Sequence, residues 1–365
     1  MVTVGIDAHK NTHTLVAVNE NGKRIGEITV DARPKGHEAL LSWLRDLDDV
    51  TVAVEDCRHL TRRLEADLLI AGHRVVRVHT RLMAGMRRGA RERGKSDPID
   101  AEAVARVALR EDNLPTAVLA GPSRDIKLFS DHRKLLVEQR TGLQAKLRWF
   151  LHELDPELCV PSRGMRRFCV LESLATELAE KPGAVAEIAR DMLSDILALT
   201  HRINAIERQL SAIVRVEYPA LLQVPGMGVL GAAMIVGETA GVTRFRNKDC
   251  FARFNGTAPI PVWSSNKVRV RLSRGGNRRI NTCLHMAAVT QLRLGDEGAA
   301  YFAKQIDAGK TRTEAFRLLR RRISDRAFAA LRADAQLHAN EPTMTVVAIT
   351  LTPKRATGVQ AQAAA

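Results

Sequence analysis

The first hundred-odd residues alternate between strand-like and helix-like spacing of hydrophobic positions. Short apolar runs that end in acids predict buried strands at "VTVGID" and "VTVAVED", and "HRVVRVHT" predicts a third. The segment "THTLVAVNENGKRIGEITV" predicts a β-hairpin that turns at Asn-Gly, and "GHEALLSWLRDL" has the spacing of a helix. Together these patterns predict a mixed α/β domain over residues 1–118.

Helical spacing replaces the strand signals from about Arg124 to Val216. Apolar residues recur in heptad steps on either side of a break that contains three prolines, Pro156, Pro161 and Pro182. The recurring positions are Phe129, Leu136, Leu143, Leu147, Phe150 and Leu154, and then Met192, Ile196, Leu199, Ile203, Ile206, Leu210 and Ile213. The pattern predicts two coiled-coil helices over residues 119–217 that pack as a hairpin or between chains, with an ordinary helical bundle as the alternative. We expect this region to be a spacer or an oligomerisation arm.

The third part, residues 218–340, is predicted to be mainly helical. It opens with "LLQVPGMGVLGAAMIVGE", two apolar helical stretches around Pro-Gly-x-Gly. This resembles a helix-hairpin-helix, whose turn lets backbone amides approach a phosphate, although such turns also join helices that bind no ligand. The tail, residues 341–365, is low in complexity and is predicted to be disordered.

Composition adds a partner class to this organisation. The 365 residues carry a net charge of +15, and the pI is near 10.1, which favours a nucleic acid held through its phosphates. We find no long apolar run or signal-peptide pattern, so no membrane partner and a cytoplasmic location are expected. Five scattered cysteines without C-x-x-C spacing argue against a disulfide framework and a zinc site. His9 and His13, four residues apart, are interpreted as incidental rather than as metal ligands.

Four acids stand at points where packing alone explains them poorly. Asp7 and Glu55 end predicted buried strands, where an unpaired carboxylate costs several kcal/mol. Asp97 and Asp100 open a predicted helix in "KSDPIDAEAVA" and share one face. The simpler interpretation of this pair is capping, with Asp97 as N-cap, Pro98 as the first helical residue and Asp100 in the first turn.

A metal site is the other interpretation of these acids. If the two strands are neighbours, Asp7 and Glu55 project together, and the helix from Asp97 brings its own two carboxylates against them. Such a cluster needs cations, and oxygen ligands suit Mg²⁺ or, alternatively, Mn²⁺. Two such ions can clamp the attacking and leaving oxygens of a phosphodiester. The neighbouring acids Asp56 and Glu102 rank lower.

The segments "GIDAHKNTHTLVAV", "VAVED" and "KSDPIDAEAVA" resemble the RNase H-like fold of the RuvC resolvases. More closely, nearly the whole chain is similar to the DEDD-type insertion-sequence transposases, which join a RuvC-like domain, a helical coiled-coil insert and a C-terminal transposase domain. Their acidic tetrad maps onto Asp7, Glu55, Asp97 and Asp100. With all four acids in place, the resemblance favours the metal interpretation over capping alone.

A second informative stretch is "FNGTAPIPVWSSNKVRVRLSRGGNRRIN". Alternation in "KVRVRLS" predicts a short strand with one basic face, which suits a phosphate backbone. Trp263 either stacks on a base or packs against its neighbours. The residues alone favour a phosphate contact or a turn for the serines there. The predicted nucleic-acid-binding residues are Lys267, Arg269, Arg271, Arg274, Arg278 and Arg279.

The resemblance assigns this stretch a reaction. In the family, a nucleophilic serine in a Ser-Gly context follows a "GTAP" turn, which places the nucleophile at Ser264. Ser265 occupies the family's glycine position and leaves the assignment open between the two serines. The resemblance implies a recombinase that forms a covalent phosphoserine intermediate with donor and target DNA, acts as a dimer or tetramer, is guided by a structured bridge RNA, and works at the nucleoid.

Two further functions remain as alternatives. A RuvC-like endonuclease would use only the acidic tetrad to activate water, and an architectural nucleic-acid-binding protein would use no chemistry at all. The last basic cluster lies on a predicted helix and is equally compatible with a solvated face and with contacts to a nucleic-acid backbone. Its members are Arg317, Arg320, Arg321, Arg322 and Arg326.

Overall fold

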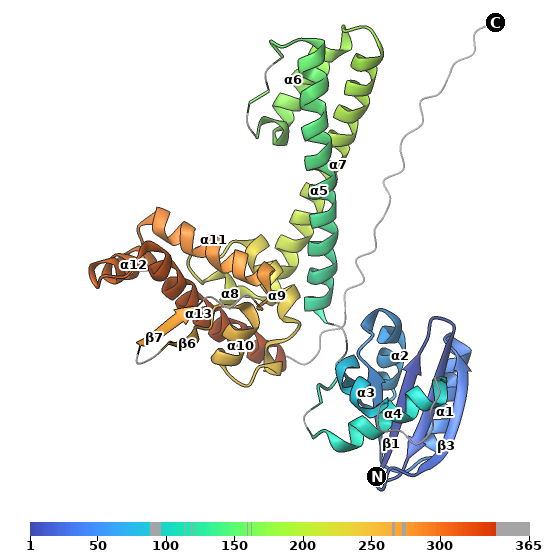
Figure 1. Ribbon diagram of the computed structural model, residues 1–365. Helices are drawn as coiled ribbons and strands as arrows, with labels where there is room; N and C mark the ends of the chain where they lie inside the picture. The colour runs from blue at the N-terminus through green and yellow to red at the C-terminus, as the bar shows by residue number, and fades with distance from the viewer. Residues whose placement is uncertain are drawn as a thin grey trace, which may run out of the picture. The chain divides into compact units, whose positions relative to one another are not determined.

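The computed structural model describes residues 1–87, 96–112, 114–117, 119, 121–158, 160–161, 163–264, 267–271 and 275–340. The chain forms two compact units, Met1–Asp125 and Ile126–Ala365 (Figure 1). The predicted finer division of the second unit, at residues 217 and 340, stays a prediction. The predicted disordered tail lies outside the described residues.

A five-stranded sheet forms the centre of the first unit. Its strands are β1 (Val2–Ala8), β2 (Thr12–Val18), β3 (Arg24–Asp31), β4 (Val50–Glu55) and β5 (Arg74–Val78). They lie in the order β3-β2-β1-β4-β5, with β2 antiparallel to both its neighbours and β4 and β5 parallel to β1. This order and these directions are those of the RNase H-like fold, so the predicted fold and hairpin are confirmed.

Helices cover both faces of this sheet because its strands alternate side chains between the two faces. One face, with Val4 and Val54, packs against Leu40 and Leu64 of the helices α1 (Pro34–Arg45) and α2 (Arg58–Ile70). The other face lies under α3 (Thr80–Arg87) and α4 (Asp97–Arg110). The sequence pattern does not predict α2 or α3, whose stability comes from packing on the sheet rather than from a clear periodicity.

Two long helices, α5 (Pro122–Leu154) and α7 (Ala184–Glu217), begin the second unit and pack along each other (Figure 1). Leu136 lies in one core with Ile203, and Leu147 lies in another with Ile196, so the predicted seam closes within one chain as a hairpin. A helix inside the predicted proline-rich break, α6 (Phe168–Ala179), follows a 3₁₀ turn, η1 (Gly164–Arg166), and was not expected.

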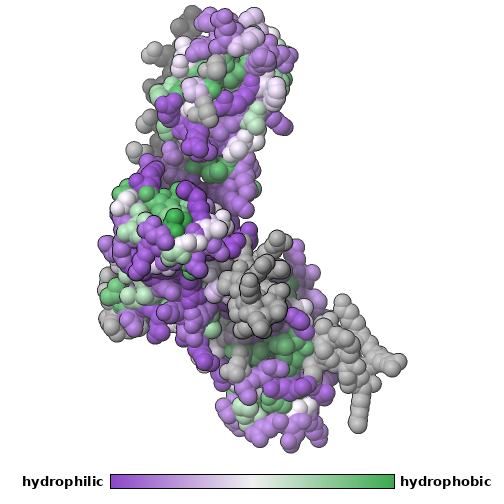
Figure 2. All heavy atoms as spheres, turned by 60° about the vertical axis from the view of Figure 1, so that its left-hand side comes forward, coloured by the Kyte–Doolittle hydropathy of each residue, from purple (hydrophilic) through white to green (hydrophobic). Residues whose placement is uncertain are grey.

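The remaining elements form a helical core around Phe251, Leu284 and Ile323. They are α8 (Pro219–Leu222), α9 (Val229–Thr239), η2 (Val242–Arg244), α10 (Lys248–Asn255), β6 (Ile260–Ser264), β7 (Lys267–Arg271), α11 (Arg278–Leu294), α12 (Glu297–Asp307) and α13 (Arg312–Asn340). In the predicted helix-hairpin-helix, the first helix is the single turn α8. None of the described helices has the length and apolar character needed to cross a membrane. Hydrophilic side chains cover most of the described surface in Figure 2, as the net charge leads us to expect.

Candidate active site

Asp7 and Glu55 stand at neighbouring positions on two adjacent parallel strands. The register pairs Ile6 of β1 with Val54 of β4, and the two acids follow at the next level of their strands. Residues at one level of adjacent parallel strands face the same way, and alternation places both acids on the face that carries Ala53 and α4. The predicted neighbourhood of these two strand ends is therefore observed.

A close approach of α4 to β1 brings two more acids to this edge. A side chain on Gly5 would place its Cβ 2.1 Å from the carbonyl oxygen of Ala101 and 2.4 Å from the amide nitrogen of Ala105. Glycine therefore lets α4 rest directly on the backbone of β1. The first turn of α4 contains Asp97 and Asp100, so this packing sets their distance from the strand ends.

The helix cap differs from the prediction by one residue. Ser96 is the N-cap of α4, in extended conformation, and Asp97 is already the first helical residue. Both acids thus lie in the first turn, where the helix dipole favours negative charge. Asp97 does not serve as the predicted N-cap, and its side chain is half exposed, at 52%.

Asp7, His9 and Asp97 form a cluster whose ligand atoms all lie within 4.8 Å of one another. The distance from His9 Nε2 is 3.0 Å to Asp7 Oδ2 and 3.6 Å to Asp97 Oδ1. Asp7 is buried, whereas the other two side chains are about half exposed, so the cluster is open to solvent on one side. His9, interpreted as incidental, therefore lies beside both carboxylates, and whether it is a metal ligand stays a prediction.

The electrostatics of Asp7 reflect the acids gathered at this edge. Burial raises the pKa of Asp7, the hydrogen-bonded His9 opposes the rise, and the charges of Asp100 and Asp97 add to it. The pKa of the Cys57 thiol is also raised, first by burial and then by Glu55 and its acidic neighbours. A divalent cation would relieve this accumulation of carboxylates.

The structure thus brings the predicted acids together to different degrees. Asp7 and Asp97 lie within reach of a common ion, and the buried Asp100 is near enough for its charge to act on Asp7. Glu55 is half-buried at the adjacent strand end. Sequence reasoning missed His9, although its position two residues after a strand-end acid is a usable signal.

The predicted serine lies at the end of a two-stranded hairpin formed by β6 and β7. Ser264 is the last residue of β6, and the register places it opposite Lys267. On β7, Lys267, Arg269 and Arg271 occupy alternate positions of the strand. Ser265 and Arg274 lie outside the described residues.

The base of this hairpin is closed by a backbone contact. A Cβ on Gly276 would lie 2.2 Å from the amide nitrogen of Gly256, so glycine permits the approach of these two segments. The backbone N–H of Asn277 also donates to the carbonyl oxygen of Phe254 at 2.7 Å. The "GTAP" turn and residues 276–277 therefore meet in space, although Gly256 and Gly276 are 20 residues apart in the sequence.

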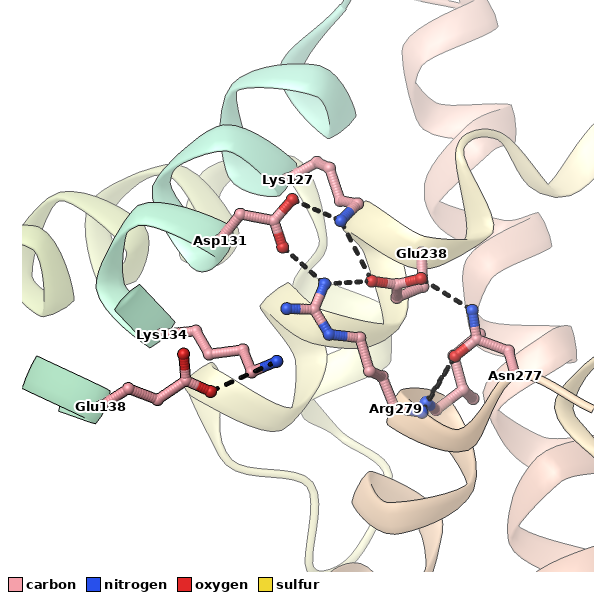
Figure 3. A network of polar contacts seen from close by, with 8 residues as sticks. Lys127, Asp131, Lys134, Glu138, Glu238, Asn277 and Arg279 are labelled. Carbon is pink, nitrogen blue, oxygen red and sulfur yellow. Dashed lines mark hydrogen bonds and ion pairs between the residues drawn. The ribbon is translucent and has the colours of Figure 1, made fainter. Parts of the chain in front are cut away.

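Arg279, one of the predicted nucleic-acid contacts, belongs to an internal network (Figure 3). Its Nη1 donates to Asp131 Oδ1 at 2.5 Å and to Glu238 Oε1 at 2.6 Å. Lys127 binds the same two carboxylates, and Asn277, which caps α11, donates to Glu238 at 2.7 Å. Although burial raises the pKa of Glu238, its hydrogen bonds from Asn277, Arg279 and Lys127 bring it below the usual value. This geometry supports a structural role for Arg279 in fixing α11 to α5 and α9.

The basic cluster of α13 also forms internal bonds. Arg321 pairs with Asp249, and two further arginines of the cluster, Arg322 and Arg326, pair with Glu297. The cluster therefore ties α13 to α10 and α12, and its two interpretations, a solvated face and contacts to a nucleic-acid backbone, stay predictions.

Two family models match the chain, and both describe transposases. A DEDD transposase model matches residues 4–156, which contain Asp7, Glu55, Asp97 and Asp100. A model described as the transposase IS116/IS110/IS902 family matches residues 218–303, which contain Ser264. The chain belongs to the IS110 family of DEDD transposases. The predicted family is thereby confirmed.

Curated relatives of this transposase span most of the chain. An uncharacterised insertion element IS116 protein of Streptomyces clavuligerus is 26% identical over 95% of this chain and 98% of its own. A probable family 20 transposase of Pseudomonas aeruginosa is 26% identical over 77% of this chain and 81% of its own. An uncharacterised insertion element IS900 protein of Mycobacterium paratuberculosis is 23% identical over 92% of this chain and 97% of its own.

Two solved structures of Thermus thermophilus RuvC are similar to part of the chain. The first is 21% identical, with a TM-score of 0.27, and covers 32% of this chain and 100% of its own. The second, in complex with a Holliday junction substrate, is 17% identical, with a TM-score of 0.26, and covers 32% of this chain and 99% of its own.

Proposed function

We propose that this transposase is a site-specific DNA recombinase of an insertion sequence, which cuts and rejoins DNA through a covalent phosphoserine intermediate. The observation that carries the proposal is the meeting of Asp7 and Asp97 around His9 at one sheet edge. Membership of the family supports the second part of the proposal, the serine nucleophile. Ser264 lies at the end of a hairpin whose other strand is basic.

The acidic site would hold Mg²⁺, with Mn²⁺ as the alternative, through Asp7, Glu55, Asp97 and Asp100. The buried, charge-crowded Asp7 and the solvent-facing Asp97 fit such an ion, because carboxylate oxygens are the ligands that these cations prefer. Imidazole nitrogen is not a preferred ligand of these cations. We therefore assign His9 the role of orienting Asp7 through their hydrogen bond. When bound, the cation supplies Lewis-acid stabilisation of the charge that develops on the phosphate.

Ser264 supplies the nucleophile in this proposal. Its Oγ attacks a DNA phosphorus, and the new Oγ–P bond replaces one P–O bond to deoxyribose. The serine hydroxyl gives up its proton and the departing deoxyribose oxygen gains one, so atoms and charge balance. The terminal hydroxyl of a second DNA strand then attacks the same phosphorus and replaces the Oγ–P bond by a P–O bond to deoxyribose. This reverse step releases the serine and needs no ATP. Lys267, Arg269 and Arg271 would hold the backbone and stabilise the developing charge.

The partners are donor and target DNA, together with a structured bridge RNA that the family resemblance supplies. The net charge of +15 suits both polyanions. The chain would act at the nucleoid as a dimer or tetramer, in which Ser264 of one copy meets the acidic site of another. Because the α5–α7 seam is closed within one chain, association through this region would use its outer faces.

The test is a denaturation-resistant protein–DNA adduct formed by full-length protein with Mg²⁺, the RNA of its native locus and labelled junction DNA. We expect the adduct to be lost in Ser264→Ala and Asp7→Asn and kept in Ser265→Ala. Asp56→Asn is the matched control, because it removes a neighbouring acid outside the proposed tetrad. Cleavage that survives both serine changes without any adduct would instead establish the RuvC-like endonuclease. Activity unchanged in Asp7→Asn would favour the architectural protein.

A further inference from the structure

A cavity of about 330 Å³ lies between the turn that precedes β6 and the beginning of α13. Residues 256–259, the "GTAP" turn, form one wall, and Arg317, Arg320 and Arg321 lie on the other with Lys310. Glu314 is the single acid among the described lining residues. The cavity is therefore positive, and it is lined by residues of neither the acidic site nor the strand β7.

Hydrogen bonds to neighbouring elements fix the conformation of the "GTAP" turn. Asn255, fully buried, accepts hydrogen bonds at its Oδ1 from the backbone N–H and the hydroxyl of Thr257, at 3.0 and 2.6 Å. Its Nδ2 donates to Ser324 Oγ of α13 at 2.8 Å, and its carbonyl accepts from Asn281 of α11 at 3.0 Å. Three elements thus hold the turn in place before any ligand arrives.

The cations facing this wall have little counter-charge: Glu314 is the single acid among the described lining residues. Hydrogen bonds from Thr311 lower its pKa, and the charges of Lys310 and Arg317 help to lower it further. Arg317 makes no hydrogen bond or ion pair within the described residues, and Arg320 donates only to the neutral Oδ1 of Asn281, at 3.0 Å. The Nε of Arg320 is buried without a partner. Burial lowers the pKa of Arg320, and the nearby charges of Arg317 and Arg278 lower it further. The carboxylate of Glu314 is already engaged by the N–H and hydroxyl of Thr311.

Like charges brought together in excess of carboxylates are costly unless an anion joins them. Arginine in particular presents a planar fork of donors that matches phosphate oxygens. Arg317 and the terminal guanidinium nitrogens of the half-buried Arg320 therefore provide donors for such an anion. Arg321 already pairs with Asp249 and Asp325, which neutralise its charge.

We infer that this cavity binds a phosphate group of the DNA strand on which Ser264 acts, with Arg317 and Arg320 as its ligands. The inference rests on the proposed function for the identity of that strand. β6 follows the "GTAP" turn directly and reaches Ser264 after five residues, about 16 Å at 3.3 Å per residue. Phosphates of one strand lie about 3.4 Å apart along a duplex, so the cavity would hold a phosphate within roughly five nucleotides of the one attacked.

The test measures binding of a labelled ten-nucleotide oligothymidine to the full-length protein in EDTA, as a function of salt. Arg317→Gln removes the unpaired cation, and Arg317→Lys keeps its charge. Arg332→Gln is the matched control, because it removes an exposed arginine of the same helix without a hydrogen bond or ion pair among the described residues, about 22 Å further along. Thermal unfolding verifies that each variant is folded.

We expect Arg317→Gln to weaken binding about tenfold, as for the loss of one charged hydrogen bond, while Arg332→Gln matches the wild type. The slope of log affinity against log salt concentration should fall by about 0.7 in Arg317→Gln only, and Arg317→Lys should restore it. Equal effects of the two glutamine variants, or an effect confined to the matching oligouridine RNA, would overturn the inference. Because EDTA prevents metal-dependent cleavage, these results do not depend on whether the serine adduct forms.

Discussion

Gly5 is the residue whose replacement tests most directly how the sheet positions the acidic site. In Gly5→Ala the new Cβ would lie 2.1 Å from the Ala101 carbonyl oxygen and 2.4 Å from the Ala105 nitrogen, both backbone atoms of α4. Neither atom can rotate away, as the end of a side chain could. The helix must therefore move outward by more than about 1 Å before this contact reaches an ordinary van der Waals separation.

Two effects should follow from that displacement. Overpacking of this kind costs about 1–3 kcal/mol of unfolding free energy. The displaced α4 also carries Asp97 and Asp100 away from Asp7, and a misplacement of about 1 Å at a reacting site can lower a rate about 100-fold. We therefore expect Gly5→Ala to lower the stability of the protein modestly. Metal binding and DNA cleavage should fall severely.

The assay combines calorimetric titration with Mn²⁺ and thermal unfolding of the full chain, followed as two transitions because there are two units. Gly142→Ala is the control, because Gly142 lies inside α5 with no atom within 4 Å of the added Cβ. It should leave metal affinity unchanged and stabilise the helix by about 0.5–1 kcal/mol. Wild-type metal affinity in Gly5→Ala would refute the idea that this contact sets the geometry of the site.

Two further predictions concern titratable groups. Burial, with His37 and His9 nearby, lowers the pKa of His13 to about 4. The unfolded chain therefore binds more protons, and up to about 3 kcal/mol of stability, complete above pH 6.5, should be lost as the pH falls toward 4. His13→Leu should flatten that part of the stability–pH curve, and an unchanged slope would contradict this assignment. Burial likewise raises the pKa of Cys283 to about 11, so at pH 8 only about one thiol in a thousand is ionised. Mass spectrometry after iodoacetamide treatment should find the exposed Cys250 alkylated well before Cys283, and equal rates would argue against this burial.

Local patterns in the sequence identified several elements together with the chemistry they carry. Alternating apolar residues that end in an acid predicted β1 and β4 and placed Asp7 and Glu55 at their ends. Heptad spacing predicted α5 and α7, because a continuous apolar stripe must be buried. These predictions depend on periodicity within a segment, which the sequence displays directly.

What remained out of reach depends on contacts between segments far apart in the chain. His9 contacts Asp97 because Gly5 lets α4 pack closely on β1. The residues around His9 in the sequence do not indicate a contact with a residue 88 positions away. Arg279 resembles a nucleic-acid contact in sequence, yet Asp131, 148 positions earlier, binds its guanidinium.

The sequence by itself thus determined which residue types carry the chemistry and which elements they occupy. The tertiary structure decided which charges meet. Coulombic and hydrogen-bond energies depend on distances of a few ångströms, which only packing of the whole unit sets. For this reason, Arg317 and Arg321, four residues apart on one helix, differ in that only Arg321 forms ion pairs with acids among the residues that the structure describes.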